Sequence, residues 1–259
     1  EMLGGGVPRR AITEIIGTPG IGKTQFCMQV AVDTQIPTMF GGIGGESVYI
    51  DTEGSFTPER AAQMADELIL HLKRVCSVGR GSRVNERNPL DLNRKDALSR
   101  MHIFRVHSNI EQIATIRSLT EFLSENTNVK LVVVDSIAFH FRHSYEDMGL
   151  RARMLSQMAQ DLNILANRFS VAVLLTNQMT MKRCSAESDF LSLAPALGET
   201  WAHAAANRIL LFWEDKQRFA KLIKSPNRAE VTVPFDIKEA GIRSQENLLV
   251  ESANKKIRI

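Results

Sequence analysis

Short apolar runs alternate with stretches of helical periodicity over residues 11–176. The apolar runs predict strands at 11–16, 47–51, 101–106, 130–135 and 170–176. Apolar residues at helical spacing predict helices after Gly22, from Pro58, after Ser108 and over 155–169. Ser108, with Glu111 three residues later, also matches a capping box. Strands that alternate with helices predict crossover connections and a mostly parallel sheet flanked by helices, which is the α/β class.

The pattern changes after residue 176. Three strand-like runs predict hairpins that extend the sheet in antiparallel fashion, at 208–213, 219–224 and 231–237. Three stretches fit no regular element: a glycine-rich one at 39–46, a polar and basic one at 76–100, and a polar one at 179–197. We expect a single domain over 1–259, with a flexible basic insertion at 76–100 and a basic tail at 250–259. The 179–197 stretch is the candidate functional loop, because ligands of open α/β sheets bind outside the carboxyl ends of the strands.

The composition excludes several classes of protein. Of the 259 residues, 44% are hydrophobic and 24% are charged, which is enough for a sizeable core and argues against a disordered chain. The apolar runs, such as the one at 131–134, are far shorter than the roughly 18 to 20 residues of a membrane helix. A net charge of +3 is too near balance for nucleic-acid binding by bulk charge, so any polyanion must be held by a local cluster. The 3 cysteines lie far apart, which indicates no disulfide framework or zinc site and fits a reducing compartment.

A phosphate-binding motif follows the first predicted strand. Its residues spell GxxxxGKT and are Gly17, Thr18, Pro19, Gly20, Ile21, Gly22, Lys23 and Thr24. In such a loop the backbone amides surround phosphate, the lysine neutralises the β- and γ-phosphates, and the threonine hydroxyl binds Mg²⁺. The strand before the loop and the helix after it disfavour an ordinary glycine turn. The sequence therefore predicts a site for ATP with Mg²⁺, to which we add the next residue, Gln25.

Two carboxylates are candidates for chemistry beside this loop. Asp135 ends the apolar run at 131–134, where an aspartate can hold a water of the Mg²⁺ shell or simply cap a turn. Glu53 lies two residues past the strand at 47–51. If that strand lies beside the P-loop strand, Glu53 projects toward the γ-phosphate and can orient and deprotonate water; otherwise it is a solvated surface residue. Asp51 is the alternative carboxylate.

Two further polar residues each have a functional and a structural interpretation. Gln178 follows the strand at 170–176, where an amide can sense a γ-phosphate and signal to the following loop, or serve as a turn residue. Arg60 lies one turn into the helix after Glu53, where its guanidinium can stack on adenine or remain solvated.

Aromatic and basic residues gather at 139–145, which reads FHFRHSY and includes Arg142 and His143. This mixture suits stacking on single-stranded nucleic acid, and it equally suits a half-buried connection with both phenylalanines in the core. Lys182 and Arg183, in the later polar stretch, form a second basic candidate.

Five segments together resemble a known family. They read GTPGIGKTQFCMQVA, YIDTEGSFTPER, LVVVDSIAF, LLTNQM and PALGETWAHAAANRILLFW. In this order they resemble the RecA-type recombinases of eukaryotes and archaea over nearly the whole chain. Within that family, QIPTMFGGIGGE, IAFHFRH and PALGETWAHA resemble the C-type branch of the eukaryotic recombinase paralogues. The resemblance implies a RecA-like P-loop NTPase core that assembles with neighbouring subunits through ATP held at the interfaces.

The resemblance also implies a role for each matching position. Lys23 and Thr24 bind phosphate and Mg²⁺, Glu53 is the catalytic carboxylate, Arg60 contacts adenine, Asp135 is the acid of the magnesium site, Gln178 couples nucleotide to DNA, and His203 senses a neighbour's γ-phosphate. Two DNA-binding loops correspond to about 142–150, with Arg142 and His143, and to about 179–197, with Lys182 and Arg183.

The chain departs from the active strand-exchange enzymes of this family in two respects. The first DNA loop lacks their glycine and arginine pattern, and Lys224 stands where they tend to carry an acidic residue that caps the neighbour's ATP. We therefore expect inefficient filament formation by the chain alone. A phenylalanine-alanine linker motif and a small helical N-terminal domain, both typical of the family, would precede Glu1.

These implications lead us to expect a DNA-dependent ATPase, weak in isolation, that assists the main strand-exchange recombinase in homologous-recombination repair. The expected partners are single-stranded DNA, other recombinase-paralogue subunits through an ATP-containing interface, and that recombinase, with no membrane. The terminal KKIR at 255–258 fits a nuclear import signal or a solvated tail, and we expect the nucleus, with some protein in the cytoplasm. The alternatives are a non-catalytic nucleotide-gated scaffold, a hexameric helicase on the same fold, and a small-molecule kinase.

Overall fold

The computed structural model of the chain describes residues 2–78, 92–142, 147–185 and 188–244. Its strands are β1 (Ala11–Gly17), β2 (Glu46–Asp51), β3 (Met101–Arg105), β4 (Val129–Asp135), β5 (Ala172–Ser185), β6 (Ser188–Pro195), β7 (Asn207–Glu214), β8 (Gln217–Lys224), β9 (Val231–Lys238) and β10 (Gly241–Ser244). Its helices are α1 (Lys23–Asp33), α2 (Pro58–Val78), α3 (Arg94–Ser99), α4 (Asn109–Glu125), α5 (Met148–Arg168) and α6 (Gly198–Ala202), with short 3-10 turns η1 (Thr38–Phe40) and η2 (Phe139–Phe141). No helix within these ranges is long and apolar enough to cross a bilayer.

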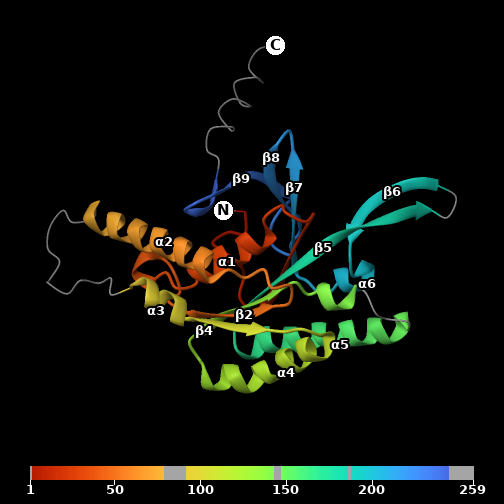
Figure 1. The fold of residues 1–259 in the computed structure, drawn as a ribbon, viewed down its shortest axis with the longest axis horizontal. Coiled ribbons are helices and arrows are strands. Elements are labelled where there is room, and N and C mark those ends of the chain that lie inside the picture. The colour runs from red at the N-terminus through yellow and green to blue at the C-terminus, as the bar shows by residue number, and fades with distance from the viewer. Residues whose placement is uncertain (1, 79–91, 143–146, 186–187, 245–259) are drawn as a thin grey trace, which may run out of the picture.

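One sheet joins the strands in the order β10-β9-β8-β7-β1-β5-β4-β2-β3, and β6 pairs with the far part of β5. Neighbouring strands from β7 to β3 are parallel. Beyond β7, the strands β8, β9 and β10 continue the sheet in antiparallel fashion. Figure 1 shows α1, α2 and α3 over one face of the sheet and α4 and α5 over the other. The predicted α/β class, the mostly parallel sheet and its C-terminal extension are confirmed.

The first C-terminal strand joins the parallel part of the sheet to the predicted hairpins. β7 is parallel to β1 and antiparallel to β8. The connection through α6 brings the chain back across the sheet before β7 begins, so that β7 enters from the same end as β1. Hairpin connections begin only with β7 and β8.

Each face of the sheet has its own hydrophobic core, which explains why the central strands are apolar without alternation. In β4, Leu131 and Val133 pack toward α1 and α2, whereas Val132 and Val134 pack toward α4 and α5. Successive side chains of a strand point to opposite faces, and both faces are covered by helices here. A continuous apolar run is therefore required.

The loop predicted at 179–197 is wrong in its secondary structure. β5 runs on past the sheet and forms an antiparallel hairpin with β6, in which Met179 pairs with Pro195. Figure 1 shows this hairpin projecting away from the body of the domain. The sequence at 179–195 shows no sustained alternation of apolar and polar residues, so hydrophobic periodicity gives no signal for the hairpin.

The flexible insertion predicted at 76–100 is wrong at both of its ends. α2 extends to Val78, and α3 occupies 94–99. Residues 79–91 lie outside the described residues, as does the predicted tail at 250–259. α5 begins at Met148, so the last residues of the first predicted DNA loop, at 142–150, are helical.

Ser108 caps α4 as the sequence predicts. Its Oγ accepts a hydrogen bond from the backbone N of Glu111 at 3.1 Å. The carboxylate of Glu111 reaches the backbone N of His107 at 2.7 Å, one residue earlier than a standard capping box. We expect Ser108→Ala to lower the free energy of unfolding by about 1 kcal/mol in urea denaturation.

Ser124→Ala is the matched control for the cap. It removes a hydroxyl that bonds the Glu121 carbonyl at the other end of α4. We expect this change to cost less than about 0.5 kcal/mol. Equal losses in the two variants would contradict a capping role for Ser108.

Candidate nucleotide-binding site

The loop between β1 and α1 has a backbone that requires glycine. Gly20 and Gly22 have φ angles of 76° and 117°. A Cβ on Gly22 would lie 2.5 Å from Cδ1 of Ile237. α1 begins at Lys23, and none of the described side chains caps its N-terminus. The first amides of this helix are therefore available to an anion, which is the condition that phosphate binding needs.

Lys23 folds back over this loop. Its Nζ donates hydrogen bonds to the carbonyls of Gly17 at 2.9 Å and Thr18 at 3.0 Å. Burial lowers the pKa of the Lys23 ammonium, and the nearby carboxylates of Asp135 and Glu53 oppose this effect. The ammonium thus lies in a partly desolvated place that faces two acids, where an anionic ligand would strengthen its charged form.

Asp135 ends β4 and is only 3% exposed. The hydroxyl of Tyr49 donates to Oδ2 at 2.7 Å, and the hydroxyl of Thr176 donates to Oδ1. Burial raises the pKa of the Asp135 carboxyl, whereas the hydrogen bonds from Thr176, Thr24 and Tyr49 lower it. The carboxylate of Asp135 and the hydroxyl of Thr24 therefore present oxygen donors at one place, which are the ligands that Mg²⁺ prefers. The residues present fit ATP with Mg²⁺.

Glu53 reaches the site although its strand does not lie beside the P-loop strand, which was the condition set for this placement. Two strands, β5 and β4, separate β1 from β2. Oε1 of Glu53 nevertheless accepts hydrogen bonds from Oγ of Ser136 at 2.7 Å and from Nε2 of Gln178 at 2.8 Å. These partners follow β4 and belong to β5, so Glu53 extends back across the carboxyl ends of two strands. Its Oε2 has no hydrogen-bond partner within the described part of the chain.

Asp51, the alternative carboxylate, builds the turn that carries Glu53. It accepts hydrogen bonds from three consecutive backbone N–H groups, those of Gly54, Ser55 and Phe56. Its Oδ2 also lies 3.0 Å from the guanidinium of Arg105. These partners occupy both carboxylate oxygens of Asp51, which therefore has a structural role. Glu53 is the carboxylate that faces the site.

A cavity of about 280 Å³ gathers most of the predicted residues. It is lined by Pro19, Gly20, Gly22, Lys23, Thr24, Gln25, Glu53, Asp135, Gln178 and Ile237. Segments that are far apart in the sequence thus meet at one edge of the sheet, where its parallel strands end. The structure brings the P-loop, both predicted acids and Gln178 together.

Arg60 and His203 lie outside this lining. Arg60 donates to Oε1 of Gln25 at 2.8 Å and to the carbonyls of Lys238 and Glu239, both at 2.6 Å. It therefore ties α2 to α1 and to the turn after β9. His203 is exposed at the end of α6. The contacts of Arg60 with adenine and of His203 with a neighbour's phosphate stay predictions.

Comparisons with known proteins agree with this geometry. The family model described as Rad51 matches residues 1–83 and 77–245 of the chain. The chain belongs to the Rad51 family. It is similar to the DNA repair protein RAD51 homolog 3 of Cricetulus griseus, with 46% identity over 246 residues, covering 94% of this chain and 65% of that protein.

The chain is also similar to two further relatives. The DNA repair protein RAD51 homolog 3 of Dictyostelium discoideum is 43% identical over 248 residues, covering 94% of this chain and 62% of that protein. The DNA repair and recombination protein RadA of Metallosphaera sedula is 33% identical over 252 residues, covering 95% of this chain and 69% of that protein. The chain thus spans less than two thirds of the length of either RAD51 homolog 3.

In this Rad51-family chain, one predicted DNA-binding residue touches the nucleotide site. Arg142, exposed after η2, donates a hydrogen bond to Oε1 of Gln178. His143 lies outside the described residues, and so do the side chains of Lys182 and Arg183, whose backbone is part of β5. The core interpretation of the aromatic segment holds for Phe141, which is buried, but not for Phe139, which is 42% exposed, and the nucleic-acid interpretation stays a prediction.

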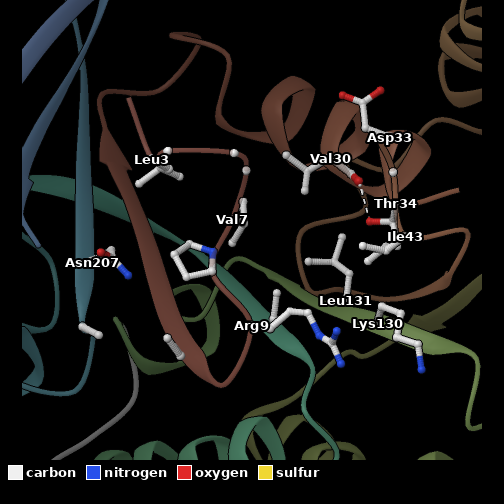
Figure 2. Close-up of a pocket in the computed structure, with 18 of the residues that line it drawn as sticks. Leu3, Val7, Arg9, Val30, Asp33, Thr34, Ile43, Lys130, Leu131 and Asn207 are labelled. Carbon is white, nitrogen blue, oxygen red and sulfur yellow. Dashed lines mark hydrogen bonds between the residues drawn. The ribbon is translucent and has the colours of Figure 1, made fainter. Parts of the chain in front are cut away.

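A cavity of about 780 Å³ in this Rad51-family chain lies away from the P-loop. It is lined by the first residues of the parallel strands, such as Ala11, Ala172 and Asn207, and by residues 3–9. Figure 2 shows Val7, Val30 and Leu131 around it, with Arg9 and Lys130 toward one side. None of the predicted site residues lines this cavity. The candidate nucleotide site is therefore identified by its motif and geometry, and not by the size of its cavity.

Sequence reasoning missed the residues that hold the two acids in place. Ser136 bonds Glu53, and Tyr49 and Thr176 bond Asp135. Ser136 directly follows Asp135, and a hydroxyl beside a candidate acid at a strand end was an available signal. Tyr49 and Thr176 lie inside strands, and only the register of β2, β4 and β5 shows that they face Asp135.

Proposed function

We propose that this chain is an ATP-hydrolysing, DNA-dependent subunit of a recombinase-paralogue complex, of the C-type branch, in homologous-recombination DNA repair. The observation that carries the proposal is an unbroken series of side chains from the P-loop cavity through Glu53 and Gln178 to Arg142. The repair pathway is supported by two relatives that are named DNA repair proteins and are 46% and 43% identical. The P-loop and Glu53 support hydrolysis over mere binding.

Each residue of the site has its own role in the proposed hydrolysis. When bound, ATP with Mg²⁺ supplies the γ-phosphoryl group that is transferred to water. The amides of the P-loop and Lys23 hold the phosphates, while Thr24 and Asp135 hold the metal. Ser136 and Gln178 fix one oxygen of Glu53, and the other oxygen orients the attacking water and takes its proton.

Gln178 connects this chemistry to DNA. Its amide donates to Glu53 and accepts from Arg142, and the next residue, Met179, begins the paired part of the β5–β6 hairpin. Single-stranded DNA binds across Arg142 and this hairpin, where Lys182 and Arg183 lie in β5. A change in the contacts of Gln178 upon ATP binding then reaches the DNA-binding segments directly.

A neighbouring subunit completes the nucleotide site. The cavity at the P-loop, about 280 Å³, is at the small end of ligand sites, and the resemblance to the recombinases implies that ATP is held between subunits. Other recombinase-paralogue subunits supply the missing wall, and the assembly assists the main strand-exchange recombinase. Such work on chromosomal DNA places the protein in the nucleus, with some in the cytoplasm.

The test of the proposed function is ATP turnover by this chain with and without single-stranded DNA, together with nucleotide binding by calorimetry. Turnover that rises with DNA supports a DNA-dependent ATPase. Binding without turnover, also after partner subunits are added, would favour the nucleotide-gated scaffold. Strand separation by rings visible in electron micrographs would favour the helicase.

Lys23→Ala tests whether the P-loop holds phosphate in this chain. The change removes a charged donor worth about 1.5 to 3 kcal/mol, so we expect the Kd for ATP to rise roughly 10- to 150-fold in calorimetry. Lys95→Ala, on the exposed side of α3, is the control and should leave the Kd unchanged. An unaltered Kd in Lys23→Ala would contradict the assignment of this loop as the phosphate-binding site.

A further inference from the structure

A fully buried carboxylate lies in the P-loop strand itself. Glu14 is in β1, three residues before Gly17, and is 0% exposed. It accepts hydrogen bonds from Nδ2 of Asn177 at 2.8 Å, Nε1 of Trp201 at 2.9 Å and Nε of Arg208 at 2.7 Å. A second guanidinium nitrogen of Arg208 lies 2.6 Å from Oε2. A buried charge with this many donors fixes their relative positions, because losing any one of them leaves desolvated charge unpaired.

The donors come from three different elements. Asn177 belongs to β5 and is the neighbour of Gln178, Trp201 belongs to α6, and Arg208 belongs to β7. Glu14 therefore joins the strand that leads into the P-loop to the strand that carries Gln178 and to α6. Further along, the backbone of Ala196 donates to the carbonyl of Gln178 at 2.9 Å, which ties the start of the α6 segment to the same place.

The turn after α6, in which His203 is exposed and Ala205 is buried, is anchored from two sides. On one side, the backbone N of Ala206 donates to the carbonyl of Ile12 in β1 at 3.0 Å. On the other, Nζ of Lys224 in β8 donates to the carbonyls of Ala202 at 3.0 Å and Ala205 at 2.6 Å. Lys224 thus turns inward onto its own chain. His203 lies between these anchors with its side chain in solvent.

We propose that Glu14 and Trp201 are positioning residues that connect the P-loop strand to the turn at 202–206, with Lys224 as the outer anchor, so that nucleotide binding rigidifies this turn. The inference rests on one part of the proposed function, the binding of nucleotide at the P-loop. It does not depend on hydrolysis or on DNA binding. Its physical basis is that β1 carries both acceptors: Glu14, in the middle of the strand, accepts from the Trp201 indole, and Ile12, near its start, accepts from the Ala206 amide, so a movement of β1 as a whole moves both. By linkage, a partner that grips the turn then alters nucleotide affinity by the same factor.

Hydrogen exchange of the whole chain, with and without saturating Mg²⁺ and the non-hydrolysable analogue AMP-PNP, tests this proposal. We expect the analogue to slow exchange in a peptide covering 202–207 by about fivefold or more, the lower end of ordinary coupling. Trp201→Phe keeps the aromatic ring but removes the Nε1–H donor. In that variant we expect the slowing to fall below about twofold, while protection of the P-loop at 17–25 persists.

The chain offers a matched control in the second of its 2 tryptophans. Trp213 is 46% exposed and stacks on Arg218, away from Glu14. Trp213→Phe should respond to the analogue as the unaltered chain does. It also leaves Trp201 as the sole indole, so its fluorescence should change as AMP-PNP saturates the site, which provides a measurement that does not require the Trp201 variant to fold.

The outcomes separate this inference from the proposed function. Protection of the P-loop without protection of 202–207, unchanged protection of that turn in Trp201→Phe, or no fluorescence response in Trp213→Phe would each overturn the inference alone. Protection of both segments in a chain that never hydrolyses ATP would support the inference and contradict the proposed hydrolysis. No protection at the P-loop would overturn both.

Discussion

Turnover of ATP lowered by about 10²- to 10⁴-fold is the expected result of Glu53→Gln. Glutamine keeps the size of the side chain and can still accept the hydrogen bond that Ser136 gives to Oε1. It cannot take the proton of an attacking water, which is the step assigned to Oε2. Because Lys23, Thr24 and Asp135 are untouched, we expect the Kd for ATP to change by less than about threefold. Steady-state turnover and calorimetry on the same preparation measure the two quantities.

Glu59→Gln is the matched control for this loss. Glu59 lies in the first turn of α2, six residues along the same segment, and its side chain is exposed. Its replacement should leave turnover unchanged. If Glu53→Gln retains normal turnover, the base lies elsewhere and Glu53 only holds Gln178. Tighter ATP binding with no turnover would instead agree with the assigned role.

The P-loop could be predicted because its signal is local. A strand, the glycines and Lys23 are consecutive in the sequence, and the positive φ angles of Gly20 and Gly22 explain the spacing. Glu53 was placed at the site on the condition that β2 lies beside β1, and this condition is not met. The carboxyl ends of parallel strands share one edge, and the turn built by Asp51 carries Glu53 over two strand ends. Glu53 therefore lines the cavity without that strand order, and its catalytic role stays a prediction.

Features that depend on pairing between distant segments could not be predicted. The stretch that forms the hairpin of β5 and β6 shows no sustained alternation of apolar and polar residues, so it looked like a polar loop. The inward turn of Lys224 onto the carbonyls of Ala202 and Ala205 needs the position of β8 relative to α6. Glu14 carried no signal at all, because a single glutamate in an apolar strand is unremarkable until its donors from β5, α6 and β7 are known.

Arg208→Met is expected to lower the free energy of unfolding by about 3 to 5 kcal/mol, the usual result of removing one partner of a buried ion pair. The side chain of Arg208 is 10% exposed and that of Glu14 is 0% exposed, so solvent cannot replace the lost donors. Methionine keeps most of the length of the arginine stem, which limits any contribution from lost packing. Urea denaturation followed by circular dichroism measures the change.

Two further variants separate an unpaired buried charge from a general effect of removing a cation. Lys221 forms a pair with Glu230 at 2.9 Å, but the two side chains are 38% and 64% exposed, so Lys221→Met should cost less than about 1 kcal/mol. The double variant Glu14→Leu with Arg208→Met removes both charges and should recover part of the loss, although Asn177 and Trp201 then lack their acceptor. If the double variant is less stable than Arg208→Met, the remaining donors matter more than the charge of Glu14. A loss below about 1 kcal/mol in Arg208→Met itself would show that Asn177 and Trp201 suffice to hold the carboxylate.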